Sequence, residues 1–362
     1  MRRWIFRVHL WCGALAGAFF AVLGLSGSVL AFESPLDRLL HARLSYVAPS
    51  QHALSLETII RSVKMRFPTD DVVAVTFAPS PKLSWEVALP SGIVYVNPYT
   101  GQVLGQRERG QTILGLAGEI HVRLATGTVG ATIIRWSNLM ALLLLISGVG
   151  LWWPNRRIRF GGLDGTRRSW SDLHQAIGAV FFTFLFIAAG TGALISFEGP
   201  IRHAIRTLRG PDSVPPLQVM SAPPSQGPTT IEPDEALRLA KATLPRDTPV
   251  RMQMPAYGGT YKVLMTERRF VGPDTERLIT IDPHSGQILS VSSDDLPLID
   301  RFFEINESVH TGSILGMVGR SLVAIAGVMI LPQAISGLFM WWKRTRSRKK
   351  REGIRLVAGV SK

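Results

Sequence analysis

Residues 10–32 read LWCGALAGAFFAVLGLSGSVLAF, a run that contains no charged side chain. About 20 apolar residues in a helix are needed to cross the hydrocarbon core of a bilayer. Three further runs meet this condition, namely Trp136–Trp153, Ala176–Phe197 and Leu322–Trp342. The sequence therefore predicts an integral membrane α-helical protein with four transmembrane helices.

The formal net charge of +14 would suit a nucleic-acid partner, but its distribution argues against one. The excess of Lys and Arg lies in three short segments that flank the apolar runs, at residues 1–8, 154–171 and 343–362. Short loops rich in Lys and Arg stay on the cytoplasmic side of a membrane. We therefore expect no nucleic-acid partner, cytoplasmic N- and C-termini, and exterior segments at residues 33–128 and 198–312.

The first apolar run follows three arginines and must be distinguished from a cleaved signal peptide. It is long for the apolar part of such a signal, and an internal segment that cannot be cleaved repeats it. We therefore expect an uncleaved membrane anchor. Cys12 is the single cysteine of the chain, which excludes disulfide frameworks, cysteine-ligated zinc and iron–sulfur clusters, and covalent haem attachment. No glycine-rich nucleotide or flavin motif follows a strand pattern.

The sequence contains an internal repeat of one unit that occurs twice. A shift of 165 residues aligns His9 with His174 and Gly13 with Gly178, and a shift of 189 aligns His121 with His310. The second shift also aligns Gly127 with Gly316, and Ser147-Gly148 with Ser336-Gly337. Both halves begin in the cytoplasm, so the pattern predicts an internal parallel two-fold repeat about an axis normal to the membrane.

The exterior segments predict two small α+β modules. In each, an amphipathic helix (SLETIIRSVKMRF, DEALRLAKATLP) precedes segments of strand-like alternation. A Pro- and Ser-rich stretch at 211–229 predicts a linker. The predicted division is a first span with its N-terminus at 1–32, a first module at 33–117, an exterior helix and second span at 118–153, a cytoplasmic loop at 154–171, a third span at 172–197, a second module at 198–305, an exterior helix and fourth span at 306–342, and a basic tail at 343–362.

Equivalent histidines related by a two-fold axis can face each other and bind one metal from both sides. Haem iron accepts imidazole nitrogen at two opposite axial positions. The sequence thus predicts two non-covalent b-type haems, one held by His9 and His174 and one by His121 and His310. The glycines that follow these histidines would leave room for the flat macrocycle, namely Gly13 and Gly178 on the same helix face as their histidines, and Gly127 and Gly316.

Two plainer interpretations stay open. A histidine at a membrane interface can simply contact lipid headgroups, and His9 can pair with a residue other than His174. Gly13 and Gly17 are spaced as in helix-packing motifs. Four histidines at equivalent sites favour the ligand hypothesis.

In the fourth run, Pro332 and Gln333 predict a kink and one buried polar group, for which the second run has no counterpart.

The chain resembles the PepSY-associated transmembrane helix family over about residues 3–345, and its exterior modules resemble PepSY domains. The resemblance rests on six segments: an R-x-H-x-W-x-G-like opening at 7–13, IHVRLATGTVG at 120–130, ISGVGLWWP at 146–154, LHQAIG at 173–178, VHTGSILGMVGR at 309–320 and ISGLFMWWK at 335–343. Members often have an arginine ten residues after each exterior histidine. Arg320 fits this pattern, whereas Ala131 departs from it, with Arg135 one turn further on.

The resemblance implies a di-haem oxidoreductase of the bacterial inner membrane that reduces a periplasmic ferric siderophore and so releases its iron. Because the chain has no flavin site, its electrons would come from a separate cytoplasmic flavoprotein or from a membrane quinol. Two other functions remain: a haem-free PepSY regulator that binds an exterior protein, and a siderophore transporter. The later spans contain no Asp, Glu, Lys or Arg of the kind that marks a coupling-ion path, which argues against transport.

Overall fold

The computed structural model describes residues 1–108, 112–154, 158, 166–209, 231–255, 259–267, 274–291 and 298–360. The chain divides into two compact units, which we call the helical unit and the sheet unit. The helical unit contains residues 1–33, 113–201 and 303–362, and the sheet unit contains residues 34–112 and 202–302. Each unit is therefore assembled from segments that lie far apart in the sequence.

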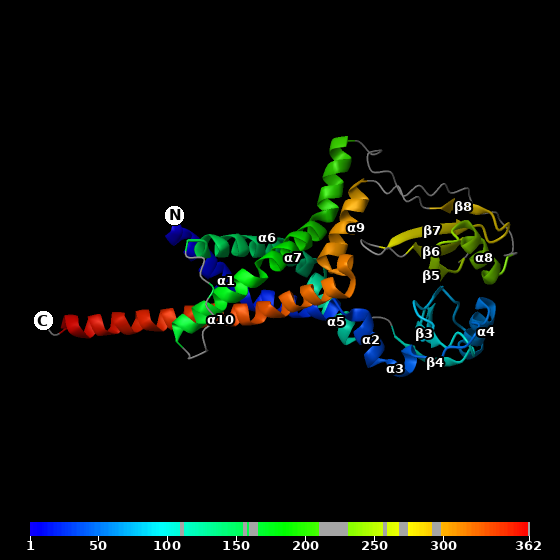
Figure 1. The fold of residues 1–362 in the computed structure, drawn as a ribbon, viewed down its shortest axis with the longest axis horizontal. Coiled ribbons are helices and arrows are strands. Elements are labelled where there is room, and N and C mark those ends of the chain that lie inside the picture. The colour runs from blue at the N-terminus through cyan, green and yellow to red at the C-terminus, as the bar shows by residue number, and fades with distance from the viewer. Residues whose placement is uncertain are drawn as a thin grey trace. The chain divides into compact units, whose positions relative to one another are not determined.

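The helical unit is built from long apolar helices (Figure 1). Among the described residues, four helices are long and apolar enough to cross a membrane, at Arg2–Leu30, Gly127–Trp152, Arg167–Ile205 and Ser313–Arg346. The helices that contribute to this unit are α1 (Arg2–Leu30), α5 (Ile113–Arg123), α6 (Gly127–Trp152), α7 (Arg167–Arg209), α9 (Leu298–His310), the 3₁₀ turn η2 (Ser313–Leu315) and α10 (Gly316–Val360).

Large apolar side chains point outward from the spans. Leu15 of α1 is 80% exposed, Ile146 of α6 58% and Val180 of α7 50%. Exposure of such a surface to water would be strongly unfavourable, because removal of apolar surface from water contributes about 25 cal/mol of favourable free energy per Å². The outward face of the helical unit is thus suited to lipid rather than water.

Helices α1 and α10 approach closely enough for their backbones to touch. A Cβ atom built on Gly24 would overlap the carbonyl oxygen of Gly327, so glycine is required where the two helices cross. Next to this crossing, the Ser28 hydroxyl donates a hydrogen bond to the Ala324 carbonyl oxygen at 2.8 Å. Small residues allow such close packing between membrane helices.

The helices extend beyond the apolar runs that predicted them. Helix α7 continues through Pro200 to Arg209, and α10 continues through Pro332 to Val360. Backbone hydrogen bonding carries a helix past the end of an apolar run, so hydropathy alone does not locate helix ends. The predicted linker at 211–229 and most of the predicted loop at 154–171 lie outside the described residues.

Within the described part of the sheet unit, the strands form one antiparallel sheet in the order β4-β3-β2-β1-β5-β6-β7-β8. The strands are β1 (Ala74–Thr76), β2 (Trp85–Leu89), β3 (Gly92–Val96), β4 (Val103–Arg107), β5 (Thr248–Gln253), β6 (Tyr261–Glu267), β7 (Thr275–Ile281) and β8 (Ile288–Val291). The helices are α2 (Glu33–Leu40), α3 (Ala42–Ser45), α4 (Leu56–Arg66) and α8 (Pro233–Thr243).

One row of buried side chains crosses this sheet. Directly paired positions place Val94, Val87, Val75, Met252, Val263 and Ile279 side by side on six neighbouring strands. All six are fully buried in a core to which Ile59 of α4 and Ala240 of α8 also belong. Strand alternation puts every second residue on the same face, so this face of the sheet packs against α4 and α8.

Helix α4 with strands β1–β4 forms one group, and helix α8 with strands β5–β8 forms a second. The two groups are joined through their first strands. Strand β1 pairs with β5, with Val75 opposite Met252. The Asp234 carboxylate of α8 also accepts hydrogen bonds from the backbone N–H groups of Leu56 and Glu57 at the start of α4, both at 2.8 Å. A carboxylate at a helix N-terminus accepts hydrogen bonds from the free N–H groups and interacts favourably with the positive end of the helix dipole. The sequence predicted two modules but gave no sign of a shared sheet.

Candidate functional site

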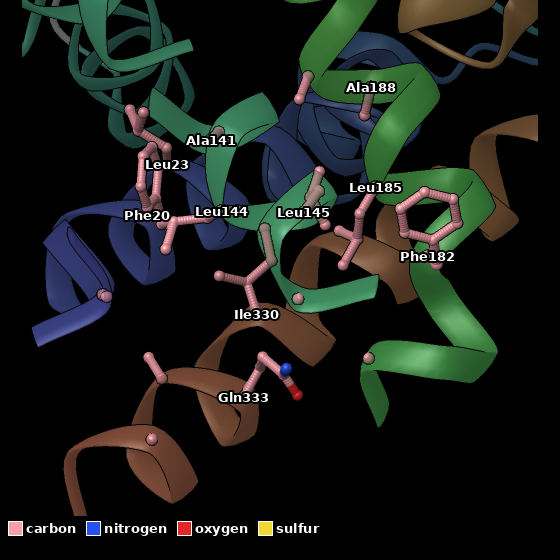
Figure 2. A pocket seen from close by; sticks show the side chains of 18 of the residues that line it. Phe20, Leu23, Ala141, Leu144, Leu145, Phe182, Leu185, Ala188, Ile330 and Gln333 are labelled. Atoms are coloured by element: carbon pink, nitrogen blue, oxygen red, sulfur yellow. The ribbon is translucent and has the colours of Figure 1, made fainter. Parts of the chain in front are cut away.

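The helical unit encloses a cavity of about 1480 Å³ that is lined by α1, α5, α6, α7, α9 and α10. Ordinary small-molecule pockets have volumes of about 300–1,000 Å³. Figure 2 shows a largely apolar lining, in which Phe20, Leu144, Phe182 and Ile330 project from different helices. The cavity is therefore large enough and apolar enough for more than one sizeable hydrophobic ligand.

The four predicted histidine ligands all line this cavity, and they meet in two pairs. The ring centres of His9 on α1 and His174 on α7 are 6.3 Å apart, and the planes of the two rings lie at 88°. The ring centres of His121 on α5 and His310 on α9 are 6.2 Å apart, with an interplanar angle of 43°. The structure thus brings together the pairs that the repeat predicted.

Every one of these rings is held by the same local arrangement on a neighbouring helix. The Nδ1 atom faces a backbone carbonyl oxygen and the hydroxyl of the residue three positions later, and the hydroxyl donates to that same carbonyl. The carbonyl and hydroxyl partners are Leu144 and Ser147 for His9, Leu23 and Ser26 for His121, Gln333 and Ser336 for His174, and Ala188 and Thr191 for His310.

This arrangement fixes which ring nitrogen carries the proton. A carbonyl oxygen can only accept a hydrogen bond, so each Nδ1 must carry an N–H group. In a neutral ring the lone pair is then on Nε2, the nitrogen that would bind a metal. Histidines that bind metals usually donate their other N–H to a carbonyl or carboxylate in this way.

A glycine lies directly against every ring, one position after the hydroxyl residue. A Cβ atom built on Gly27 would lie 2.7 Å from Cε1 of His121, and one built on Gly192 would lie 3.0 Å from Cε1 of His310. For Gly148 beside His9 and Gly337 beside His174 the corresponding distances are 3.2 and 3.3 Å. The edge of each ring that carries Cε1 and Nδ1 therefore contacts a helix backbone that has no side chain at that point.

The two pairs lie far apart along the helices. His9 and Gly27, which contacts His121, are 18 residues apart on α1. At 1.5 Å per residue this corresponds to about 27 Å along the helix axis. The hydrocarbon core of a bilayer is about 30 Å thick, so the two pairs are separated by nearly the full thickness of a membrane.

The four glycines predicted to make room for a macrocycle fall into two groups. Gly13 and Gly178 line the cavity, and a Cβ on Gly178 would lie 3.2 Å from the Gln333 amide nitrogen. Gly127 and Gly316 are not among the lining residues. They begin α6 and α10 in the left-handed conformation, at φ +64° and +59°, where glycine is favoured. Their spacing after the histidines reflects a turn rather than an open cavity wall.

Sequence reasoning missed the hydroxyl groups that hold the rings. A usable signal was present, because Ser or Thr precedes Gly at 26–27, 147–148, 191–192 and 336–337. Two of these dipeptides served only to align the repeat. Their role could be recognised only when the neighbouring helix bearing each histidine was in place.

Arginines are among the polar residues that line this largely apolar cavity. Arg135 lines it within the span of α6, where its Nε donates to the Ser196 carbonyl at 2.9 Å. The other lining arginines belong to the basic segments that flank the spans, and they are Arg2, Arg3, Arg7, Arg167 and Arg344. Arginine pairs well with carboxylates, so these side chains could bind the acidic groups of an apolar ligand.

The residues of this cavity fit haem. An imidazole bound at a metal–nitrogen distance of about 2 Å has its ring centre about 3 Å from the metal, so two opposed rings have centres about 6 Å apart. The observed 6.3 and 6.2 Å agree with this arrangement. Two histidines suffice as the axial ligands of a haem iron, and the described residues contain no larger cluster of His, Cys, Asp or Glu suited to a metal ion.

Together, the four apolar spans and the paired histidines define a multi-pass helical membrane protein with a cavity built inside its bundle. No curated protein matches the chain. Residues 6–344 match the model of the PepSY-associated TM region. The chain belongs to this family.

Proposed function

We propose that this protein is a di-haem transmembrane electron carrier that reduces a ferric siderophore on the periplasmic side of the bacterial inner membrane. The observation that carries the proposal is the geometry of the two histidine pairs. In both pairs the ring centres are about 6 Å apart and each Nδ1 atom is held by a carbonyl oxygen, and all four histidines line one common cavity.

Each histidine pair would hold one b-type haem, which when bound supplies one-electron chemistry at its iron. The carbonyl and hydroxyl partners of Nδ1 fix the direction of each ring, and the glycines leave the rings no side chain to clash with. With haem bound, the apolar wall of the cavity would keep water away from the path between the pairs. The arginines that line the cavity would neutralise the carboxylates of the two ligands.

The charge pattern supports the direction of transfer. The basic flanks favour cytoplasmic termini, which would put the His9–His174 pair near the cytoplasm and the His121–His310 pair near the periplasm. The sheet unit would then lie in the periplasm, where we propose that it binds or gates the ferric complex. Electrons would enter from a separate flavoprotein or from a quinol.

The chemistry of the acceptor supports a reductive release of iron. Siderophores hold ferric iron through hard, mostly anionic oxygen atoms. Gain of one electron lowers the charge of the metal from +3 to +2, and the Coulombic attraction to each oxygen falls in proportion. Hard oxygen ligands also favour the ferric ion over the softer ferrous ion, so reduction would loosen the complex.

The test is an absorbance spectrum of the detergent-purified full chain, oxidised and then reduced with dithionite, together with a pyridine haemochrome assay. We expect two b-type haems per chain. Membrane vesicles with the sheet unit outward and a reductant inside should then reduce an external ferric hydroxamate, detected with a ferrous-iron chelator. A colourless protein from cells supplied with haem would overturn the proposal in favour of a haem-free regulator.

A further inference from the structure

Gln333 is a polar exception in the lining of the cavity. Four residues supply the carbonyl groups that hold the histidine rings, and three of them, Leu23, Leu144 and Ala188, have apolar side chains. The fourth is Gln333 of α10, at the position that the 189-residue shift aligns with Leu144. Figure 2 shows its amide on α10 near Ile330 of the same helix, in a lining whose other labelled side chains are apolar.

This single residue contacts both nitrogens of the His174 ring. Its backbone carbonyl accepts from Nδ1 at 3.1 Å, and its side-chain amide nitrogen lies 3.2 Å from Nε2. Because Nδ1 carries the ring proton, Nε2 is the acceptor and the Gln333 amide is the donor. Within the described part of the chain, His9, His121 and His310 make hydrogen bonds through Nδ1 alone.

The rest of the Gln333 amide is poorly satisfied. Its Oε1 atom is buried and has no hydrogen-bond partner. Its nitrogen lies against Gly178, where an added Cβ would be 3.2 Å away. A buried acceptor without a partner is unfavourable, so this position of the amide depends on the hydrogen bond to His174 and on the space that Gly178 leaves.

We propose that Gln333 sets the affinity of the His9–His174 site by capping the nitrogen that must bind the iron. The inference rests on the proposed function. Haem can bind to His174 only when the amide leaves Nε2, so the haem-free site is favoured by one hydrogen bond that the His121–His310 site lacks. The amide therefore lowers the affinity of the His9–His174 site for haem, and removal of the amide should raise it.

The test measures haem loss from the full-length holoprotein in detergent to an excess of a haem-scavenging apoglobin. Wild type should show two phases, which His9→Ala and His121→Ala assign to the two sites by each removing one. Gln333→Leu copies the side chain of Leu144 and removes the cap. We expect it to slow haem loss at the His9–His174 site by about fivefold, the value of one net hydrogen bond, and to leave the other phase unchanged.

The reverse variant, Leu144→Gln, adds an amide at the matched position beside His9 and should speed haem loss from the same site. The unchanged His121–His310 phase reports in both variants that the protein has folded. Equal rates in wild type and Gln333→Leu, or faster loss from Gln333→Leu, would overturn the inference while the proposed function stands. Absence of haem from the wild-type chain would overturn both.

Discussion

The two histidine pairs share one ring-holding arrangement but differ in how tightly the surrounding helices confine them. His9 and His174 lie within long spans, whereas His121 and His310 lie at the ends of the shorter helices α5 and α9. Glycine backbones approach the His121 and His310 rings more closely. A Cβ atom built on the glycine would lie 2.7 and 3.0 Å from Cε1 of these two rings, against 3.2 and 3.3 Å at the other pair. The interplanar angles also differ, at 43° and 88°.

The difference teaches that two sites made of the same two side chains, here a pair of histidines, need not be equivalent. At the His121–His310 pair, close glycine contacts leave the rings little freedom. At the His9–His174 pair, the fit is looser and the Gln333 amide competes for a ligand nitrogen. In the proposed function, haem binding at the His121–His310 pair would therefore depend on steric fit, and haem binding at the His9–His174 pair would depend on a polar competitor.

The largest expected effect is the loss of one haem when a ligand is removed. His9→Ala and His174→Ala should each yield a protein with one haem per chain and the same remaining spectrum, because the proposed function has the two residues bind one iron. His121→Ala and His310→Ala should leave the other haem. Pyridine haemochrome and reduced difference spectra measure this, with the exposed His52→Ala as a control that retains two haems. If His9→Ala and His174→Ala lost different haems, the pairing would be wrong.

A smaller effect is expected when the glycines beside the rings gain a methyl group. Overpacking costs about 1–3 kcal/mol, and the 2.7 Å approach puts Gly27→Ala at the upper end of that range. Gly337→Ala, with a Cβ at 3.3 Å, should weaken its haem only slightly. Haem dissociation rates of the two proteins test this order. Gly150→Ala is the matched control, because nothing lies within 4 Å of its added Cβ; equal effects at Gly27 and Gly337 would contradict the steric explanation.

Removal of the hydroxyl groups should weaken both sites alike. Ser26→Ala and Ser336→Ala each leave the carbonyl partner of Nδ1 in place, so the cost is that of one neutral hydrogen bond, about 1 kcal/mol, or about fivefold in haem affinity. Ser137→Ala serves as a control, since its hydroxyl donates to the carbonyl three residues earlier but contacts no histidine ring. A much larger loss at either site would mean that the hydroxyl, not the carbonyl, orients the ring.

The smallest effect on the haem sites is expected from the sheet unit. Burial raises the pKa of Glu86 on β2 above its ordinary value, and the nearby Arg107 only partly opposes this. A carboxyl whose folded pKa is raised contributes stability below its unfolded pKa and loses it as the pH rises through the folded pKa. Relative to wild type, Glu86→Gln should therefore stabilise the sheet unit increasingly as the pH rises from about 4 to 7.

Amide hydrogen exchange in residues 85–96, measured across that pH range, tests this effect, and the spectra of both haems should stay unchanged. A pH-independent difference between Glu86→Gln and wild type would contradict the role of ionisation. A change in either haem spectrum would show that the sheet unit acts on the histidine pairs, which would then no longer be independent of it.

Several features of the sheet unit could be predicted only in part. The alternation that follows the first amphipathic helix predicted strands, and β1, β2 and β3 follow that helix in the structure. Pairing of β1 with β5 could not be predicted, because it joins Val75 to Met252 across a sequence separation that no local pattern records. The same holds for the Asp234 carboxylate that caps α4.

By itself, the sequence determined the membrane class and the family of this protein, because hydropathy and motif spacing are properties of the chain read along its length. It also singled out four histidines through the repeat. Only the tertiary structure decided which carbonyl and hydroxyl hold each ring, which glycine lies beneath it, and that Gln333 contacts both nitrogens of His174. Those contacts depend on where helices cross, and a crossing is set by packing between segments far apart in the chain.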